Sequence, residues 1–476
     1  MAIRAYPKLA PNPGTLRVWV GTRQNARLPQ LTFTVNGLDR APKVLRPMNS
    51  IRSPELLNDA GTPRAFSGVF EFDGLAEGQE HEIRVRADTE MGLAVARART
   101  LPRALSADPE SWFNVLVGSC FYPGGDNAKF LKTTLANLPV AFRPNASLLL
   151  GDQVYLDLPT FEDFENDLKW LAARFERTYA ETWFGEDYSP ILSLAPSACV
   201  PDDHEYWNNY PHHSPFVGNT ATERGRKRWE TAARALFTGF QLGSSDAIGT
   251  PVVFDVAPLS FFLADTRTFR SADRARTMHP DALLALGRWV QYVRDHGLTG
   301  VFVSGQSLFD EAANALESAV ADRSLANYGD YRRILTHLAE LSSAGRTLLC
   351  VTGDVHWGRV LRASDPLSGA PRAFEVICSP SSLVDSPWDF WNRIRHAGAD
   401  WPRHSDGLDG PRSFPIAGQR WSCKPVYKRK GDQVAVLSFR RFAGSVQLRV
   451  SYWPVHGRAD VRRPKILEPF ALSTPG

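Results

Sequence analysis

Apolar runs that each end in a small or polar cluster recur along the chain from Phe113 onward. They are FNVLVGSC, SLLLGDQVY, SACVPDDHE, SFFLADTR, GVFVSGQS, LLCVTGDVHW and AFEVICSP. Helical patterns lie between several of these runs, over Asn127–Phe142, Phe161–Thr182, Thr222–Phe237, Asp281–Asp295 and Asp330–Ser342. Continuous apolar strands that alternate with helices are typical of a buried, largely parallel sheet. The pattern therefore predicts an α/β domain over residues 112–476.

Residues 1–105 follow a different pattern, in which apolar residues alternate with polar or small ones. The alternating segments are Leu16–Val20, Leu31–Gly37, Val69–Gly74, His81–Asp88 and Leu93–Thr100. Short strands of this kind, separated by turn residues, indicate a small antiparallel β-sandwich. The segment LPRALSADPESW is then predicted to be a linker between this N-terminal domain and the α/β domain.

The last part of the chain returns to alternation. Val434–Phe439 and Val446–Trp453 are predicted to form a hairpin that closes a sheet. The segment Ser381–Lys430 is rich in Pro, Trp, Asp and Arg and shows little periodicity, so it is predicted to be a lid or a cleft wall. Its Trp-rich part, Ser386–Gly398, fits a cleft wall and a packed core equally well.

The composition excludes several classes of protein. With 43% hydrophobic and 22% charged residues over 476 positions, the chain is an ordinary globular one rather than a disordered or fibrous one. A net charge of +4 gives no nucleic-acid footprint, and no run approaches the ~20 apolar residues of a membrane span. The start of the chain lacks a signal peptide, so we expect a cytoplasmic protein or the mature form of an exported one. The odd number of cysteines, 5, argues against a disulfide framework.

Polar side chains with ligand chemistry follow the apolar runs. They are Cys120, Asp152, Asp202, Asp203, His204, Asp265, Gln306, Asp354 and His356. In open α/β sheets, ligands bind beyond the carboxyl ends of the strands. Carboxylate, imidazole and amide donors suit hard or borderline cations, and two cations that share a carboxylate can hold both oxygens of a phosphoryl transfer. Asp152 is the best candidate for that shared ligand, because it directly follows LLLG.

Each of these features also has a purely structural interpretation. Asp203 and His204 could be a helix cap and a surface histidine, and Asp354 with His356 could be a structural pair. Cys120 could be a buried, inert thiol. Accidental clustering of all of them at strand ends is the less favoured interpretation, since every one follows an apolar run.

The set GSC, GDQVY, DDHEYWNN, ADTR and GDVHW, in this order and spacing, resembles the alkaline phosphatase D family of the calcineurin-like metallophosphoesterases. The resemblance covers most of Phe113 to Val360. It implies a four-layered αββα sandwich, preceded by a small N-terminal β-sandwich domain. The implied activity is that of a metal-dependent phosphoesterase, an alkaline phosphatase, a phosphodiesterase or both.

The resemblance also implies a ligand set for two metals. Cys120, Asp152 and Tyr155 match iron ligands, and Asp354 and His356 match the final metal motif. An amide or carboxylate of Asp203, Asn208 or Asn209 completes a second site, where the family uses calcium. Thiolate and phenolate are anionic donors that suit ferric iron, with zinc or manganese as alternative metals.

The remaining implied roles concern the substrate, a small-molecule phosphate ester attacked by a metal-activated hydroxide. His204 is expected to contact the phosphate or act as general acid. Arg267 is a candidate to bind a non-bridging phosphate oxygen through the forked donors of its guanidinium. Gln306 and Trp357 are further candidates for binding the substrate.

Two other functions compete with this one. The first is a thiol or serine hydrolase that uses Cys120 or Ser119 with His356, although the chain lacks a GxSxG nucleophile elbow. The second is a non-catalytic binding protein, against which the full set of candidate ligands argues.

Overall fold

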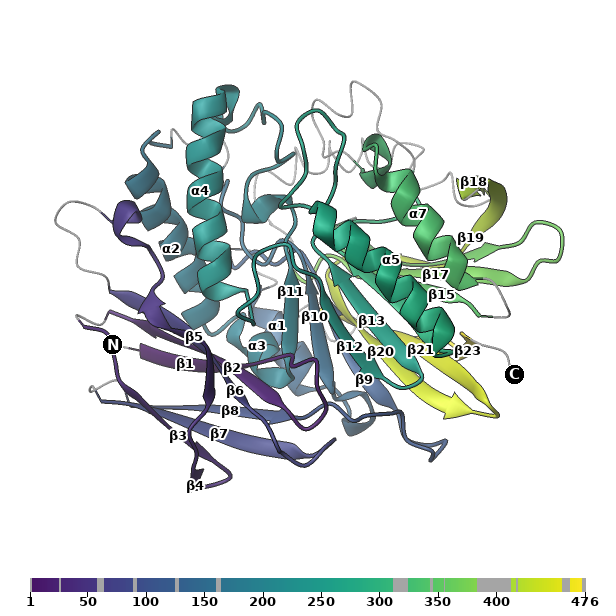
Figure 1. The fold of residues 1–476 in the computed structure, drawn as a ribbon, viewed down its shortest axis with the longest axis horizontal. Coiled ribbons are helices and arrows are strands. Elements are labelled where there is room, and N and C mark those ends of the chain that lie inside the picture. Colours follow the sequence, from purple (N-terminus) through teal and green to yellow (C-terminus); the bar gives the residue numbers. More distant parts are fainter. Residues whose placement is uncertain are drawn as a thin grey trace.

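The computed structural model describes most of the chain. The described residues are 2–24, 27–57, 64–88, 92–124, 128–159, 164–310, 324–342, 346–354, 356–382, 412–416, 418–455 and 463–472. They form several β-sheets and a smaller number of helices, which confirms the predicted mixed α/β class (Figure 1). In this part of the chain no helix is both long and apolar enough to cross a membrane.

The largest sheet has 11 strands, and its centre is parallel. In spatial order the main path is β22-β21-β20-β9-β10-β11-β1-β2-β6-β5, with β23 paired to β21. The strands of its centre are β9 (Phe113–Gly118), β10 (Ala146–Leu150) and β11 (Ser197–Val200). They run parallel to one another, so their carboxyl ends meet at one edge of the sheet.

A second sheet has 8 strands in the order β12-β13-β14-β15-β17-β16-β19-β18. Its strands are β12 (Val252–Val256), β13 (Leu259–Ala264), β14 (Thr299–Ser304), β15 (Leu348–Thr352), β16 (Trp357–Ser364), β17 (Pro371–Ile377), β18 (Arg412–Ile416) and β19 (Gln419–Lys430). The neighbouring pairs β13–β14, β14–β15 and β15–β17 are parallel, and the other neighbouring pairs of this sheet are antiparallel.

The two sheets pack face to face, with helices outside each of them. Val115 and Leu148 of the first sheet and Val301 and Val351 of the second are fully buried in one shared core. Because strand residues alternate between faces, the neighbouring Leu116 instead packs with helices α1 to α4. The opposite face of the second sheet packs against α5 and α7. The molecule therefore has four layers, helix, sheet, sheet and helix (Figure 1).

All five predicted helices are confirmed, with shifted ends. They are α1 (Ala128–Ala136), α2 (Leu168–Phe184), α4 (Glu223–Phe240), α5 (Pro280–Asp295) and α7 (Tyr331–Ala339). A short further helix, α3 (Ser189–Leu194), was not predicted. Helix α1 ends before the predicted Phe142, because Pro139 cannot continue a helix. Helix α2 begins after the predicted Phe161, where Asp167 caps it by accepting from the amides of Lys169 and Trp170.

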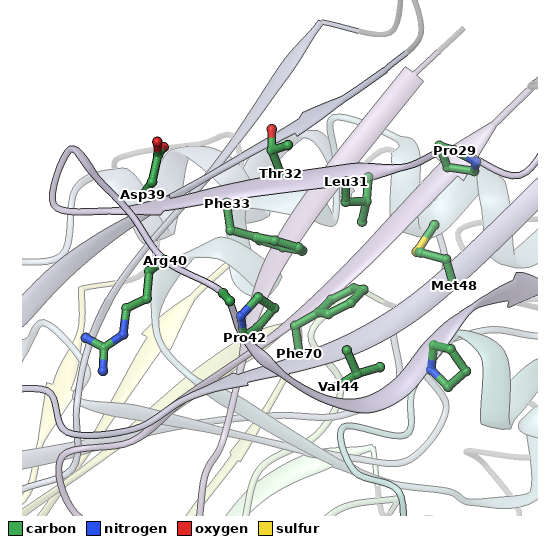
Figure 2. Close-up of a pocket in the computed structure, with 12 residues that line it drawn as sticks. Pro29, Leu31, Thr32, Phe33, Asp39, Arg40, Pro42, Val44, Met48 and Phe70 are labelled. Carbon is green, nitrogen blue, oxygen red and sulfur yellow. The ribbon is translucent and has the colours of Figure 1, made fainter.

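The N-terminal region contains all five predicted strands and three more. The strands are β1 (Ala2–Lys8), β2 (Leu16–Arg23), β3 (Leu31–Val35), β4 (Leu38–Asp39), β5 (Lys43–Ser50), β6 (Ala65–Phe72), β7 (Glu80–Ala87) and β8 (Leu93–Arg99). A separate four-stranded sheet, β4-β3-β7-β8, shares a core with β1, β2, β5 and β6. At one side that core opens into a cavity of about 810 Å³, where the rings of Phe33 and Phe70 lie 4.8 Å apart between centroids (Figure 2). None of the predicted site residues lines this cavity.

The junction between the two regions is a shared sheet. Strand β1 pairs antiparallel with β2 along its length and parallel with β11 through Lys8 and Ser197. The 11-stranded sheet thus continues across the boundary predicted at residues 105–112, and the division into two domains stays a prediction.

The C-terminal segments differ in part from the prediction. Strands β20 (Gln433–Phe442) and β21 (Ser445–Pro454) form the expected hairpin, and β20 lies beside β9. Two short strands, β22 (Lys465–Ile466) and β23 (Phe470–Ala471), follow.

The second half of Ser381–Lys430 is not aperiodic but forms β18 and β19, while the role of the segment as a lid or cleft wall stays a prediction. Alternation is present there, since Trp421 and Cys423 are buried while their neighbours are not. Residues 383–411, with the Trp-rich segment 386–398, lie outside the described residues.

Candidate metal centre

The ends of four parallel strands bring candidate ligands together. Asp152 follows β10, Asp202 and Asp203 follow β11, and Asp354 follows β15. One carboxylate oxygen from each lies within 4.8 Å of the others. His204 forms an overlapping group of three with Asp152 and Asp203, within the same distance. Cys120 follows β9, and its sulfur lies 3.4 Å from Asp152 Oδ2. The residues that sequence patterns place at separate strand ends therefore converge on one cluster.

The backbone at this cluster adopts an uncommon conformation. Nine non-glycine residues of the described chain have positive φ, and five of them are candidate ligands. These are Cys120 (54°), Asp152 (56°), Asn209 (70°), Asp354 (64°) and His356 (58°). Left-handed geometry costs a residue with a side chain roughly 1–3 kcal/mol, and such strain gathers at functional sites.

Glu205 holds the loops of the cluster in place. Its Oε2 accepts from the amides of Asp152 and Asp202, both at 2.8 Å. Its Oε1 accepts from the amide of Gln153 at 2.7 Å and from Gln241 Nε2 at 3.0 Å. Sequence reasoning missed this role. The available signal was the spacing of Asp202 and Glu205, which is that of a capping box.

A buried lysine supports the same assembly from the N-terminal region. Lys8 Nζ donates to the carbonyl oxygen of Gln241 at 3.1 Å and lies 3.7 Å from Cys199 Sγ. The side chain is buried, and burial lowers the pKa of its amine. The contacts thus run from β1 through Gln241 to Glu205, and from there to the backbone of the candidate ligands.

Arg267 lies behind Asp202. Its Nε and Nη2 both donate to Asp202 Oδ1 at 2.6 Å, and its backbone amide donates to Asp265 Oδ1 at 3.0 Å. Arg267 is 0% exposed. These contacts give it a positioning role for Asp202, while the predicted contact with a phosphate oxygen stays a prediction.

His204 is oriented by a second carboxylate, Asp157. His204 Nδ1 lies 2.8 Å from Asp157 Oδ1, and the other oxygen of Asp157 accepts from the amide of Asn208 at 2.8 Å. The Tyr155 ring packs on the imidazole with centroids 4.3 Å apart. This arrangement leaves Nε2 as the ring nitrogen for the cluster. Sequence reasoning did not single out Asp157, whose only signal was its place two residues after Tyr155.

The charges around His204 favour its protonated form. Burial lowers the pKa of the imidazole. The carboxylates of Asp157, Asp203 and Asp152 raise it by more, and the resulting pKa is about 10. Cations bound among the same carboxylates would oppose this effect, because they offset the negative charge that attracts the proton.

Negative charge and burial dominate at the cluster, despite Arg267 and His204. Burial raises the pKa of Asp152 well above its ordinary value, and the nearby Asp203, Glu205 and Asp354 raise it further. Burial likewise raises the pKa values of the Cys120 thiol and the Tyr155 phenol. Buried acids in this state gain from a bound cation, which favours their ionised forms.

Buried polar atoms without a hydrogen-bond partner also fit a metal site. Among the described residues, the Tyr155 hydroxyl and Asp202 Oδ2 are buried and have no hydrogen-bond partner. Buried groups of this kind cost about 1–3 kcal/mol each unless something pairs with them. The donor set of carboxylates, phenol, thiol and imidazole suits metal ions, so the residues present fit the metals that the family resemblance implies.

The other predicted residues lie around the cluster. Asp354 Oδ2 accepts from Gln306 Nε2 at 3.1 Å, and Asp203 Oδ2 accepts from the amide of Asn209 at 2.9 Å. Trp357 begins β16 and is buried, with Lys428 Nζ 5.5 Å from its ring centroid. The predicted contacts of Gln306 and Trp357 with substrate, and the metal role of His356, stay predictions.

Two solved structures illustrate what the chain is similar to. One, described as the structure of PhoD, has a TM-score of 0.62 and 12% sequence identity, over 98% of this chain and 90% of that chain. The other, described as GAP50, the anchor in the inner membrane complex of Plasmodium, has a TM-score of 0.37 and 9% identity, over 76% and 89%. No family model and no curated protein matches the sequence. The first likeness shows that the chain has a PhoD-like fold.

Proposed function

We propose that this protein is a metal-dependent phosphoesterase with a dinuclear site. The observation that carries the proposal is the group of four buried or half-buried aspartates, Asp152, Asp202, Asp203 and Asp354, with ligand oxygens within 4.8 Å. The PhoD-like fold supports it, since the cluster lies at the carboxyl ends of the strands. The four layers support the αββα arrangement of such enzymes, with the N-terminal strands as its β-sandwich.

Two cations would be held here, with Asp152 as the candidate shared ligand. Cys120 and Tyr155 would hold iron, and Asp203 with Asn208 or Asn209 would hold calcium. Asp354 and His356 complete the set, and zinc or manganese are the alternative metals. Cations held there supply Lewis acidity, which activates water and neutralises charge on a phosphoryl group.

The chain's own residues prepare the reaction around that site. Asp157 holds the imidazole of His204 so that Nε2 serves the cluster, where it donates a proton to the leaving oxygen. Arg267 and Glu205 fix Asp202 and Asp152 in place. Because these partners are buried, the geometry is set before the substrate binds, as electrostatic catalysis requires.

The thiol-hydrolase alternative has less support from the geometry. Cys120 is 0% exposed, and its sulfur lies 3.0 Å from Ser379 Oγ and 3.2 Å from Ser119 Oγ. A nucleophilic cysteine needs a lowered pKa and access to its substrate, whereas burial raises the pKa of this thiol.

Hydrolysis of phosphate esters tests the proposal directly. We expect the purified protein, supplied with iron and calcium, to release para-nitrophenol from an aryl phosphomonoester or phosphodiester. A chelator should remove this activity, and metal should restore it, because the reaction needs the cations. An aryl carboxylate ester serves as the control substrate. Activity that survives the chelator and disappears with a thiol reagent would instead support the thiol hydrolase.

Ferric iron at Cys120 and Tyr155 predicts a coloured protein. A phenolate bound to ferric iron gives a visible charge-transfer band, so the iron-loaded protein should absorb in the visible range. Tyr155→Phe should lose or shift this band. The matched control is Tyr122→Phe, since the Tyr122 ring lies 5.8 Å from that of Tyr155. A fully active, iron-free and colourless protein would contradict the iron assignment while leaving zinc or manganese open.

A further inference from the structure

A buried glutamine links the second sheet to the candidate metal centre. Gln306 follows β14, is 3% exposed, and donates from Nε2 to Asp354 Oδ2 at 3.1 Å. The sequence predicts a contact with substrate for this residue. Its burial and its hydrogen bond to a candidate ligand favour a different role, in which it acts on Asp354.

The orientation of the Gln306 amide is set by Arg270, which is also buried. Arg270 Nη2 donates to Gln306 Oε1, and Arg270 Nε donates to the carbonyl oxygen of Thr266 at 2.9 Å. A guanidinium has donors and no acceptor, so the amide oxygen of Gln306 must face Arg270. The Nε2 group, which can only donate, is thereby directed at Asp354.

The backbone around Gln306 is joined to the end of β15. Ser304 Oγ donates to the carbonyl oxygen of Gln306 at 2.8 Å. The amide of Gly353, the residue before Asp354, donates to the carbonyl oxygen of Gly305 at 3.0 Å. The strand ends that carry Gln306 and Asp354 are therefore connected through the main chain as well as through the side chains.

A buried ion pair holds the residues that follow Gln306. Glu375 of β17 is fully buried, and its Oε1 accepts from the amide of Leu308 at 2.7 Å and from Ser307 Oγ at 3.1 Å. Its Oε2 accepts from Arg359 Nη2 at 2.8 Å. Glu375 thus supports the loop after β14 in the way that Glu205 supports the loops after β10 and β11.

We propose that Gln306 is a positioning residue for the candidate ligand Asp354, and that Arg270 acts by orienting Gln306. The proposal rests on the metal centre of the proposed function. A donor held against a ligating carboxylate fixes the direction of that carboxylate before the cation binds. Outer partners of this kind are typically worth about 10–100-fold in metal affinity. A substrate contact would instead change KM and leave the metal affinity as it is.

Manganese binding to the metal-free protein tests the positioning role. Calorimetric titration with Mn²⁺ alone measures Kd for the wild type and for Gln306→Met, which keeps the length of the side chain but removes its donor and acceptor. We expect Kd to rise by about tenfold or more. Gln306→Asn, whose amide is one methylene shorter, is the second variant and should show a similar rise. Gln291→Ala, at an exposed residue of α5, should keep the wild-type Kd.

A double variant tests whether Arg270 acts through Gln306. Arg270→Met alone should raise the Kd for Mn²⁺, because the amide can then turn. The double variant Gln306→Met/Arg270→Met should bind Mn²⁺ no more weakly than Gln306→Met, since residues that act as one unit are not additive. Two losses that multiply would show that Arg270 has a separate role. Arg288→Ala, at an exposed residue of α5, is the control, and thermal unfolding of each metal-free protein checks that it folds.

The outcomes distinguish this proposal from the proposed function. If the wild-type protein binds neither Mn²⁺ nor iron or calcium, the metal centre itself fails. If Gln306→Met binds Mn²⁺ like the wild type while KM for a phosphodiester rises, Gln306 is a substrate contact and the positioning role is wrong. Wild-type affinity together with wild-type kinetics would also overturn that role, and the phosphoesterase would stand.

Discussion

Asp152→Ala is expected to abolish both metal binding and hydrolysis. Asp152 is fully buried, and its carboxylate lies beside Cys120 Sγ and the His204 amide and within the group of four aspartates. In the proposed dinuclear site, removing it would take away the anionic ligand that both cations share. Without the cations the reaction loses its nucleophile and its electrostatic support together. Metal analysis and a phosphodiester assay on the same preparation measure the two losses.

The conservative variant Asp152→Asn separates charge from shape. It keeps the volume of the side chain and removes the negative charge, so metal content should again fall sharply. Asp281→Ala is the matched control, since Asp281 lies in the first turn of α5 with a side chain that is 83% exposed. Retention of activity by Asp152→Ala would show that the shared-ligand assignment is wrong.

His204→Ala should keep its metals and lose turnover. The imidazole is held by Asp157. In the proposed reaction it would deliver a proton, and help of this kind is typically worth ~10²–10⁴-fold. We therefore expect kcat to fall by about that factor on substrates with poor leaving groups, while metal content stays near wild type. The loss should be smaller for para-nitrophenol, because a good leaving group needs less protonation.

The partner of His204 provides a further check. Asp157→Asn keeps a hydrogen-bond acceptor near Nδ1 but removes the charge, so its kcat should lie between those of the wild type and His204→Ala. His296→Ala, at an exposed residue that caps the end of α5, is the control. Loss of metal from His204→Ala would mean that this histidine is a ligand rather than an acid.

The sequence predicts the parallel strands and the cluster for one physical reason. A strand that is buried on both faces must be apolar throughout, so the first polar residue after it marks its end. Asp152 after LLLG and Asp354 after CVTG are the clearest examples. Parallel strands point in one direction, and ends that are identified along the chain therefore lie together in space.

The supporting residues are harder to predict, because their roles depend on long-range contacts. Glu205 accepts from amides 52 and 53 residues away in the chain, and Arg267 reaches Asp202 from 65 residues away. A buried acid of this kind has the same local pattern as a surface turn residue. Only the packing of the strands shows which donors it faces.

Strand β1 was missed for a different reason. Pro7 interrupts the run AIRAYPK, and a proline inside an apolar segment argues against a central strand. The structure accommodates it because the β1–β11 ladder has a single pair, Lys8 with Ser197, so most of that edge of β1 needs no ladder amide.

This junction affects how the protein can be dissected. The strands of the N-terminal region continue the sheet that carries Asp152 and Asp202. Lys8 donates to the carbonyl oxygen of Gln241, whose side chain donates to Glu205. A fragment cut at residue 112 would leave β11 as a bare edge and Gln241 without its donor. The N-terminal strands therefore help to support the candidate metal centre, and exchanging them for an unrelated domain would disturb that centre.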